Sequence, residues 1–199
     1  MSAQHQTPIE PLDSTILSEE WGRLTRHRFR LRRRDGTWQE QTREVYDRGN
    51  GAVCLLFNPE TGCVLLTRQF RLPVWVCGRD PLMIEAPAGF LDGAEPAERM
   101  RAELIEETGF EVSELEHLYD LHTSPGSVTE YLAFFTGVYS MGDRVSGGGG
   151  EAGEGEDIEV LHVPLVTALE MVRQGAIADA KTVILLQELA LRQAGQGKS

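Results

Sequence analysis

Residues 88–110, with the sequence AGFLDGAEPAERMRAELIEETGF, decide our interpretation of the fold. Pro96 is suited to the first turn of an α-helix, and Gly109 is suited to the position just after a helix ends. Between them, apolar residues recur at helical spacing on one side and charged residues gather on another. The stretch therefore predicts a glycine-containing turn followed by a helix over residues 96–108.

The predicted helix carries three glutamates on one face. Glu103, Glu106 and Glu107 stand at positions i, i+3 and i+4, where like charges repel by a few tenths of a kcal/mol per pair. Most acidic helix faces are simply solvated. Arg99 can pair with Glu103 one turn later, which would leave Glu106 and Glu107 uncompensated. Because the preceding turn brings backbone carbonyls to the helix flank, the pattern favours hard oxygen ligands for Mg²⁺ or Mn²⁺, which in turn bind phosphates.

The composition is that of an ordinary globular chain, with 199 residues of which 41% are hydrophobic and 25% are charged. This length is enough for one domain with a real core, together with a small extra module. The formal net charge of −12 opposes general affinity for nucleic acid or anionic membranes. It does not oppose a phosphate substrate, because local arginines and metal ions can attract one.

Cysteine usage and hydropathy favour a cytoplasmic location. Cys54, Cys63 and Cys77 are scattered and form no CxxC pair, so neither a zinc site nor a disulfide framework is indicated. The polar N-terminus lacks the apolar core of a signal peptide, and no run approaches the roughly 18 apolar residues of a membrane span. We therefore expect no membrane partner.

The N-terminal part of the chain predicts a small module. The polar composition of residues 1–15, which include two prolines, predicts a frayed N-terminus. Residues 16–48 are expected to form an antiparallel β-module, because the Asp-Gly pair at 35–36 is a strong hairpin-turn signal. The arginines that alternate along residues 28–32 leave two interpretations open, a nucleic-acid surface or a solvated strand face. We favour the strand face because no stacking aromatics accompany the arginines.

Residues 49–199 are expected to form a second, larger domain. Its elements follow the order strands, helix, strands, helices, which is neither a regular βαβ alternation nor a repeat array. We therefore expect an α/β (α+β) fold with a mixed sheet packed between helices. The Gly- and Glu-rich residues 143–157 are typical of a flexible linker or of surface disorder. The expected strands are residues 51–57, 63–71, 156–164 and two within 119–140, and residues 83–90 are expected to be a short strand that runs into a glycine turn. The expected later helices are residues 166–175 and 178–193.

The quoted stretch resembles the Nudix box, whose usual form is G-x5-E-x7-R-E-U-x-E-E-x-G-U, where U is an apolar residue. Gly89, Gly109 and Phe110 fit this pattern directly, as do the three glutamates of the helix. The segment between Gly89 and Glu103 is one residue shorter than usual. The first glutamate of the box therefore corresponds to Glu95 when the gap is placed after it.

Ala102 stands where the usual box has the arginine that supports the glutamates by ion pairing, and Arg99 or Arg101 can substitute for it. The chain resembles the bacterial GDP-mannose pyrophosphatase branch of the Nudix family, which also has the shortened box and lacks this arginine. The resemblance covers roughly residues 18–190. Its motifs are REVYDRGNGA, RQFR, SPGSVTE, EDIEV and LEMVRQG…KTVILL.

The resemblance implies a Nudix α/β/α sandwich, preceded by an antiparallel β-module that pairs two subunits into a homodimer. It implies Mg²⁺- or Mn²⁺-dependent hydrolysis of a nucleoside diphosphate sugar, with GDP-mannose giving GMP and mannose 1-phosphate. ADP-ribose or another ADP-sugar is the alternative substrate. A non-catalytic Nudix-fold binding protein is a further alternative, which the full set of glutamates disfavours. The implied metal ligands are the carbonyl of Ala88 and the carboxylates of Glu103, Glu107 and Glu156.

The implied catalytic residues are Glu106, Glu107, Glu130 and Glu156. A general base must reach the attacking water, and Glu130 and Glu156 are the candidates for that role. Glu156 follows the glycine-rich segment, where a mobile loop would close over the substrate and exclude water.

The resemblance also implies substrate contacts, each with an ordinary alternative. Arg71 would bind phosphate through its guanidinium fork, or would be a surface residue at a strand end. Lys181 would contact phosphate or sugar, or would be a surface residue at a helix start. Trp21 would stack on the base, or would lie in the module core. Arg43 and Glu44 would hold the nucleotide sugar, in a site shared between subunits if the module crosses to its partner. The other implied contacts are Ala88, Gly89 and Glu130.

Overall fold

The computed structural model describes residues 8–196 and divides the chain into two compact units. The first unit comprises the residues up to Gly49 together with Ser124–Glu130. The second unit comprises Asn50–Thr123 and the residues from Tyr131 onward. All the described helices belong to the second unit, whereas the first is built from strands and loops.

Strand β1 (Ile9–Glu19) corrects our expectation of a frayed N-terminus over residues 1–15, of which residues 1–7 lie outside the described part. It pairs antiparallel along its length with β2 (Arg23–Arg32). As an edge strand, β1 tolerates Pro11, which lies beside a shift in the pairing register. Composition suggested fraying because it does not report this ladder of backbone hydrogen bonds.

Strands β2 and β3 (Trp38–Asp47) form the predicted hairpin. Gly36 has a φ of 85°, which is the left-handed backbone that an Asp-Gly hairpin turn requires. The arginines of β2 pair with acidic residues on the neighbouring strands: Arg28 lies 2.8 Å from Asp13 and 2.5 Å from Glu40. This pairing is what we expected of a solvated strand face.

The SPGSVTE segment (Ser124–Glu130) joins the first unit through backbone hydrogen bonds to the end of β3. The Tyr46 N–H donates to the Ser127 carbonyl at 2.9 Å, and the Thr129 N–H donates to the Tyr46 carbonyl at 3.1 Å. A segment distant in sequence therefore contributes to the same unit as the N-terminal sheet.

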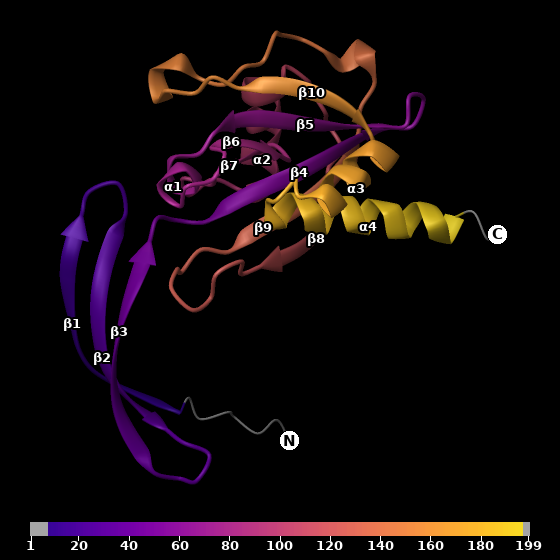
Figure 1. Ribbon diagram of the computed structural model, residues 1–199. Helices are drawn as coiled ribbons and strands as arrows, with labels where there is room; N and C mark the ends of the chain where they lie inside the picture. The colour runs from indigo at the N-terminus through magenta and orange to yellow at the C-terminus, as the bar shows by residue number, and fades with distance from the viewer. Residues whose placement is uncertain (1–7, 197–199) are drawn as a thin grey trace. The chain divides into compact units, whose positions relative to one another are not determined.

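A seven-stranded mixed sheet forms the centre of the second unit (Figure 1). Its strands are β4 (Gly51–Asn58), β5 (Cys63–Phe70), β6 (Leu82–Glu85), β7 (Ala88–Phe90), β8 (Glu116–Leu121), β9 (Leu132–Val138) and β10 (Glu159–Pro164). The main path has the order β10-β5-β4-β9-β8, while β6 pairs with β5 and β7 pairs with β4. Strands β4 and β9 are parallel, and the other pairs are antiparallel.

Helices cover both faces of this sheet (Figure 1). Helix α2 (Pro96–Glu103) lies on one face, and α3 (Leu165–Gln174) and α4 (Ala180–Gln196) lie on the other. The short elements are α1 (Leu72–Val76), the π-helical turn η1 (Leu104–Thr108) and the 3-10 turns η2 (Met141–Asp143) and η3 (Ala152–Glu154). Within residues 8–196, none of the helices has the length and apolar character that a membrane crossing requires.

The buried core has two halves because alternate residues of β4 point to opposite faces of the sheet. One half packs against α2 and the other against α3 and α4, so the expected α/β/α sandwich is confirmed. The first half includes Ala52, Cys54, Leu56, Met100 and Leu104, and the second includes Val53, Leu55, Ala168, Leu185 and Leu186.

The glutamate helix extends over α2 and η1 as predicted, but its last turn is π-helical. Pro96 occupies its start, and Gly109 ends it with a φ of 80°. Single π-helical turns are frequent at functional sites, and this one contains two of the three predicted glutamates.

Candidate active site

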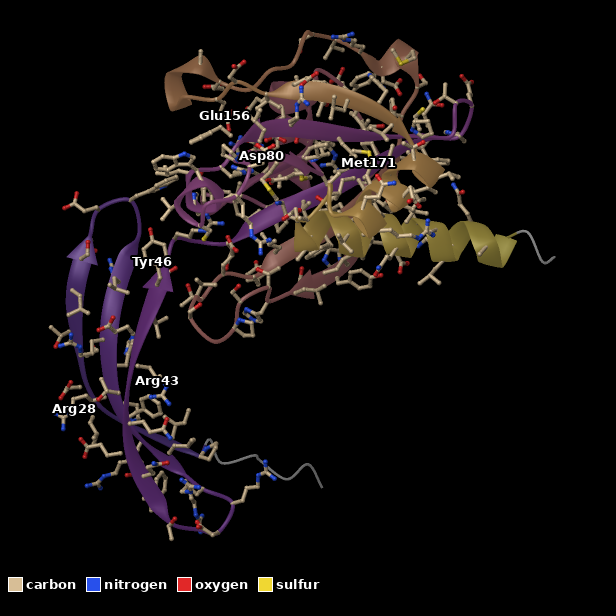
Figure 2. All side chains as sticks on the ribbon, viewed as in Figure 1. Arg28, Arg43, Tyr46, Asp80, Glu156 and Met171 are labelled. Atoms are coloured by element: carbon tan, nitrogen blue, oxygen red, sulfur yellow. The ribbon has the colours of Figure 1, made fainter. Side chains whose placement is uncertain are left out.

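Glu107 is the most buried carboxylate of the glutamate helix, with 1% of its surface exposed. Burial raises the pKa of Glu107, and the nearby carboxylates of Glu103 and Glu156 raise it further, to about 8, against a hydrogen bond from Ala88 and the charge of Arg71. Glu156, whose charge contributes to this rise, lies in the loop before β10 (Figure 2). The structure therefore brings together residues that are about fifty positions apart in the sequence.

Strand β7 lies beside the glutamate helix, close to the carboxylates of Glu103 and Glu107. The Ala88 N–H donates to Oε2 of Glu107 at 3.1 Å, and Gln69 Nε2 donates to Oε1 of the same residue at 3.4 Å. A Cβ atom at Gly89 would overlap the carboxylate of Glu103. The glycine of the Nudix-like turn thus leaves the space that the Glu103 carboxylate occupies, and its backbone is not left-handed.

Arg99 supplies the ion pairing that Ala102 does not. Its Nη2 lies 2.6 Å from Glu103, and its Nη1 lies 3.4 Å from Glu106. Our expectation that Glu106 is uncompensated is therefore wrong, since Arg99 reaches it from two turns away. Arg101 does not take this role, because its Nε donates to the backbone carbonyl of Ser113 at 2.9 Å.

The donors of this cluster fit a hard divalent cation. Carboxylate oxygens and the Ala88 carbonyl are the ligand types that Mg²⁺ and Mn²⁺ prefer, and a bound cation would offset the repulsion that raises the pKa of Glu107. Among residues 8–196, no three His, Cys, Asp or Glu side chains are already grouped so that they could hold a metal ion by themselves. Glu103, Glu107 and Glu156, which the resemblance implies as ligands, therefore do not already form such a three-carboxylate group.

A second charged cluster joins Arg71 and Lys181 through Glu85, a residue that our sequence analysis missed. Glu85 accepts two hydrogen bonds of 2.9 Å from Arg71 and one of 2.6 Å from Lys181. Burial by itself would raise the pKa of Glu85, but these two cations lower it to about 2. The ionised carboxylate thus fixes the positions of both predicted substrate contacts.

The start of α4 completes this second cluster. Lys181 Nζ lies 2.9 Å from Asp179, and the Thr182 hydroxyl donates to Asp179 at 2.6 Å while it accepts the Ala86 N–H at 2.7 Å. These bonds attach α4 to the chain that leaves β6. The sequence signal that could have found Glu85 is a single carboxylate within the apolar segment MIEA.

The predicted residues Trp21 and Glu130 lie in the first unit and have opposite environments. Trp21 is 84% exposed, so the alternative that it belongs to the module core is wrong. Glu130 is buried and accepts a hydrogen bond of 2.7 Å from Arg48. The pairing keeps a charged partner beside a buried carboxylate.

Arg43 and Glu44 also lie in the first unit, on strand β3. Figure 2 labels Arg43 on this strand. Both are exposed. Arg43 donates to the Thr42 carbonyl at 2.8 Å, and Glu44 lies 3.3 Å from Arg26. Neither interaction buries the side chain, so both residues are accessible to a ligand.

The glycine-rich segment before Glu156 is bound to the glutamate helix. The Gly149 N–H donates to the Glu107 carbonyl at 2.9 Å, and the Gly150 N–H donates to the Glu106 carbonyl at 3.0 Å. The interpretation of this stretch as a flexible linker or surface disorder is therefore wrong for these glycines.

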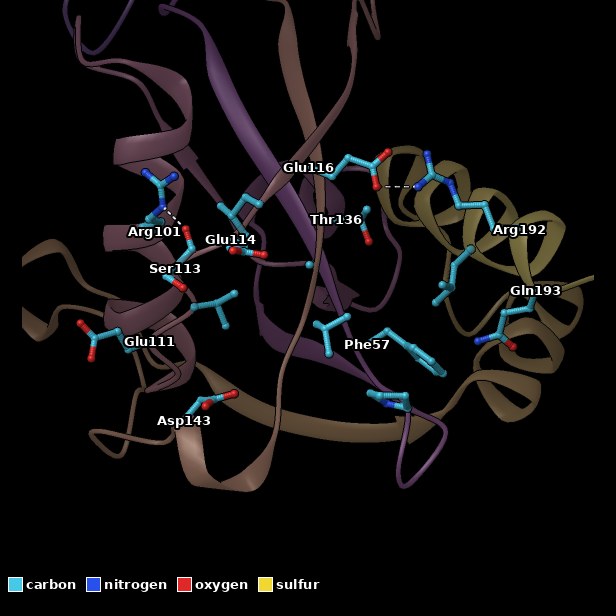
Figure 3. Close-up of a pocket in the computed structure, with 16 residues that line it drawn as sticks. Phe57, Arg101, Glu111, Ser113, Glu114, Glu116, Thr136, Asp143, Arg192 and Gln193 are labelled. Carbon is cyan, nitrogen blue, oxygen red and sulfur yellow. Dashed lines mark hydrogen bonds and ion pairs between the residues drawn. The ribbon is translucent and has the colours of Figure 1, made fainter. Parts of the chain in front are cut away.

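A groove of about 990 Å³ lies elsewhere in the second unit, between α4 and residues 111–116 (Figure 3). Its wall includes the ion pair of Arg192 with Glu116, at 2.8 Å. Among the described residues, the groove is lined by none of the predicted site residues. It is thus separate from the two charged clusters.

Two family models match the chain, one over each part. The model described as "GDP-mannose pyrophosphatase NudK N-terminal domain" matches residues 8–46, and the model described as "NUDIX domain" matches residues 47–185. A protein of Cronobacter sakazakii named GDP-mannose pyrophosphatase is 50% identical over 185 residues, covering 92% of this chain and 96% of that protein. A protein of the same name from Escherichia coli K12 is 49% identical over 182 residues, covering 91% and 94%.

A solved structure also has this fold. The crystal structure named "ADP compounds hydrolase" matches with a TM-score of 0.75 over 99% of this chain and 100% of that chain. The sequence identity is 17%, so this likeness concerns the architecture alone.

Proposed function

The chain belongs to the NUDIX family, and from that premise we propose that it hydrolyses the diphosphate bond of a nucleoside diphosphate sugar, with GDP-mannose giving GMP and mannose 1-phosphate. The observation that carries this proposal is the near-50% identity to GDP-mannose pyrophosphatases over more than nine-tenths of the chain. The N-terminal match, over residues 8–46, supports the same substrate class.

Nudix hydrolases generally use a divalent metal, and we propose Mg²⁺ here, with Mn²⁺ able to replace it. Glu103, Glu107, Glu156 and the Ala88 carbonyl would hold it. A bound cation would neutralise charge on the diphosphate and would lower the pKa of the attacking water. Its binding also favours the ionised form of Glu107, whose proton must leave before the carboxylate can act as a ligand.

The residues of this chain would divide the remaining work. Arg71 has its Nε and Nη2 on Glu85, so the outer edge of its guanidinium is directed away from that pair and is available to a phosphate oxygen. Lys181 forms an ion pair with the same carboxylate and places a second positive charge beside Arg71. We propose Glu156 and Glu130 as the candidates to take the proton from water, with Glu106 holding Arg99 beside the cluster.

We assign the first unit to subunit pairing and nucleotide recognition in a homodimer. Strand β1 exposes Ile9, Leu12 and Ile16, and such an apolar edge strand is unfavourable in water unless another surface covers it. The exposed Trp21 offers an aromatic face for the base, and Arg43 and Glu44 offer polar contacts for the nucleotide sugar.

A substrate panel tests this function. With Mg²⁺ present, kcat/KM is measured for GDP-mannose, ADP-ribose, ADP-glucose and a dinucleoside polyphosphate, and the products are identified. We expect GDP-mannose to give the highest kcat/KM and to yield GMP with mannose 1-phosphate. A higher value for ADP-ribose would contradict the substrate assignment and leave the hydrolase class intact. Glu107→Gln, purified in the same way, controls for contaminating phosphatases.

A further inference from the structure

The segment Val145–Gly150, here called the glycine strap, is fastened to the end of the glutamate helix. The N–H groups of Val145 and Ser146 donate to the Gly109 carbonyl at 2.8 and 3.2 Å. Further along the strap, two glycine N–H groups donate to the carbonyls of the π-helical turn, as described above. The last carbonyls of a helix have no partner within the helix, so the strap satisfies groups that would otherwise need water.

The same strap also holds Glu156. The Ile158 N–H donates to the Gly149 carbonyl at 3.0 Å, which attaches the chain after Glu156 to the strap. The carboxylate of Glu156 accepts the Glu151 N–H at 2.9 Å. Backbone hydrogen bonds therefore link the segment that contains Glu156, through the strap, to the helix that carries Glu107.

At two positions of the strap, a side chain would meet both neighbouring atoms and a left-handed backbone. Gly148 has a φ of +65°, and a Cβ there would lie 2.5 Å from the Thr108 carbonyl carbon and 2.7 Å from the Glu107 carbonyl oxygen. Gly150 has a φ of +78°, and a Cβ there would overlap the Glu156 carboxylate and lie 2.8 Å from its Cβ. Both the left-handed backbone and the close contact oppose a larger residue.

We propose that Gly148 and Gly150 are positioning residues, which set the distance between Glu156 and the Glu107 carboxylate. This inference rests on the proposed function, because that function makes Glu156 a ligand of the divalent cation. Gly148 acts by letting the strap approach the helix backbone. Gly150 acts by leaving the space that the Glu156 side chain occupies. The glycines thus serve precise docking of the strap and not flexibility.

The test compares Gly148→Ala and Gly150→Ala with Gly147→Ala and Gly153→Ala. The control glycines have no atom within 4 Å of a built Cβ. Mn²⁺ affinity is measured by calorimetry on the full-length protein, and kcat and KM are measured for GDP-mannose. We expect the two strap variants to weaken Mn²⁺ binding and lower kcat by at least ~10-fold, as for groups that orient metal ligands, with a smaller change in KM. The controls should behave as the unsubstituted protein.

A second readout needs neither metal nor turnover. In the metal-free protein, Gly148→Ala should speed amide hydrogen exchange over the strap, and Gly147→Ala should not. Because the contact of Gly150 is with a side chain that can move, Gly150→Ala should stay folded even if Gly148→Ala does not. Wild-type Mn²⁺ affinity and kcat in Gly150→Ala, alongside weakened binding in Glu156→Gln, would overturn the proposal. Wild-type affinity in Glu156→Gln would instead contradict the role of Glu156 in the proposed function, and this inference with it.

Discussion

The backbone N–H of Ala88 donates a hydrogen bond of 3.1 Å to the carboxylate of Glu107. This bond joins β7 to the π-helical turn and holds a buried carboxylate beside the peptide whose carbonyl is a proposed metal ligand. The main chain of Ala88 therefore has two roles, one through its N–H and one through its carbonyl. The geometry makes Glu107 the residue whose replacement is most informative.

Glu107→Gln should leave the protein folded and lower kcat at least ~100-fold, because the substitution removes a charged metal ligand. The amide keeps the size of the side chain and can still accept the Ala88 N–H. Steady-state kinetics with Mg²⁺ and a circular dichroism spectrum measure the two effects. Glu98→Gln, on the exposed side of the same helix, is the matched control. Near-normal turnover in Glu107→Gln would rule out the site assignment.

The stabilising effect of Mg²⁺ should grow with pH. Glu107 has a folded-state pKa of about 8, above the ordinary value of 4.5, so the folded metal-free protein binds a proton more tightly than the unfolded chain. The free energy of unfolding of the metal-free protein therefore falls as the pH rises from about 4.5 to about 8. A bound cation offsets that loss. Melting temperatures with Mg²⁺ and with chelator, measured across this window, should diverge as the pH rises.

Glu107→Gln provides the control for this pH dependence, since the amide does not titrate. In that variant the metal-free melting temperature should change less between pH 5 and pH 8 than in the unsubstituted protein. Equal dependence in the two proteins would show that another group is responsible.

Glu85→Gln should destabilise the second unit, because it leaves Arg71 and Lys181 beside a buried neutral group. Breaking a buried ion pair typically costs 3–5 kcal/mol, and partial exposure of Arg71 reduces this to about 2–3 kcal/mol. Urea denaturation measures the change in the free energy of unfolding. Glu170→Gln, which removes an exposed ion pair with Arg173, should leave the urea midpoint nearly unchanged. A similar shift in both variants would contradict the special role of Glu85.

Mixed subunits should test whether the active site is shared. Arg43→Ala and Glu107→Gln subunits are each expected to be inactive alone. If the first unit of one subunit completes the site of the other, unfolding and refolding the two together should restore part of the activity, because some sites then carry neither substitution. Size-exclusion chromatography establishes that the mixture contains dimers. An inactive mixture of dimers would argue that each site is built within one subunit.

Local patterns in the sequence predicted a large part of the second unit. The helix over residues 96–108 was predictable because its start, its end and its apolar spacing all lie within one segment. The strands of the sheet were predictable because runs of apolar and β-branched residues mark them without reference to distant residues. The family resemblance predicted the reaction class, because its motifs occur in order along nearly the whole chain.

Local sequence patterns predicted fewer of the contacts within the candidate active site. Glu85 and Lys181 are 96 positions apart, so no local pattern reveals their ion pair. The choice between Arg99 and Arg101 as the support of the glutamates depended on which side of α2 faces β7. The glycine-rich segment was misread as flexible because its composition is the same whether or not a helix end is available to bind it.

The sequence by itself determined the elements, the family and the glutamates, because secondary structure and motifs depend on residues that are close along the chain. The tertiary structure decided how those glutamates are held: which arginine pairs with them, what space Gly89 and Gly148 leave, and which distant segment brings Glu156 near enough to raise the pKa of Glu107. These features depend on distances between segments far apart in sequence, and packing sets such distances only when the whole unit has folded.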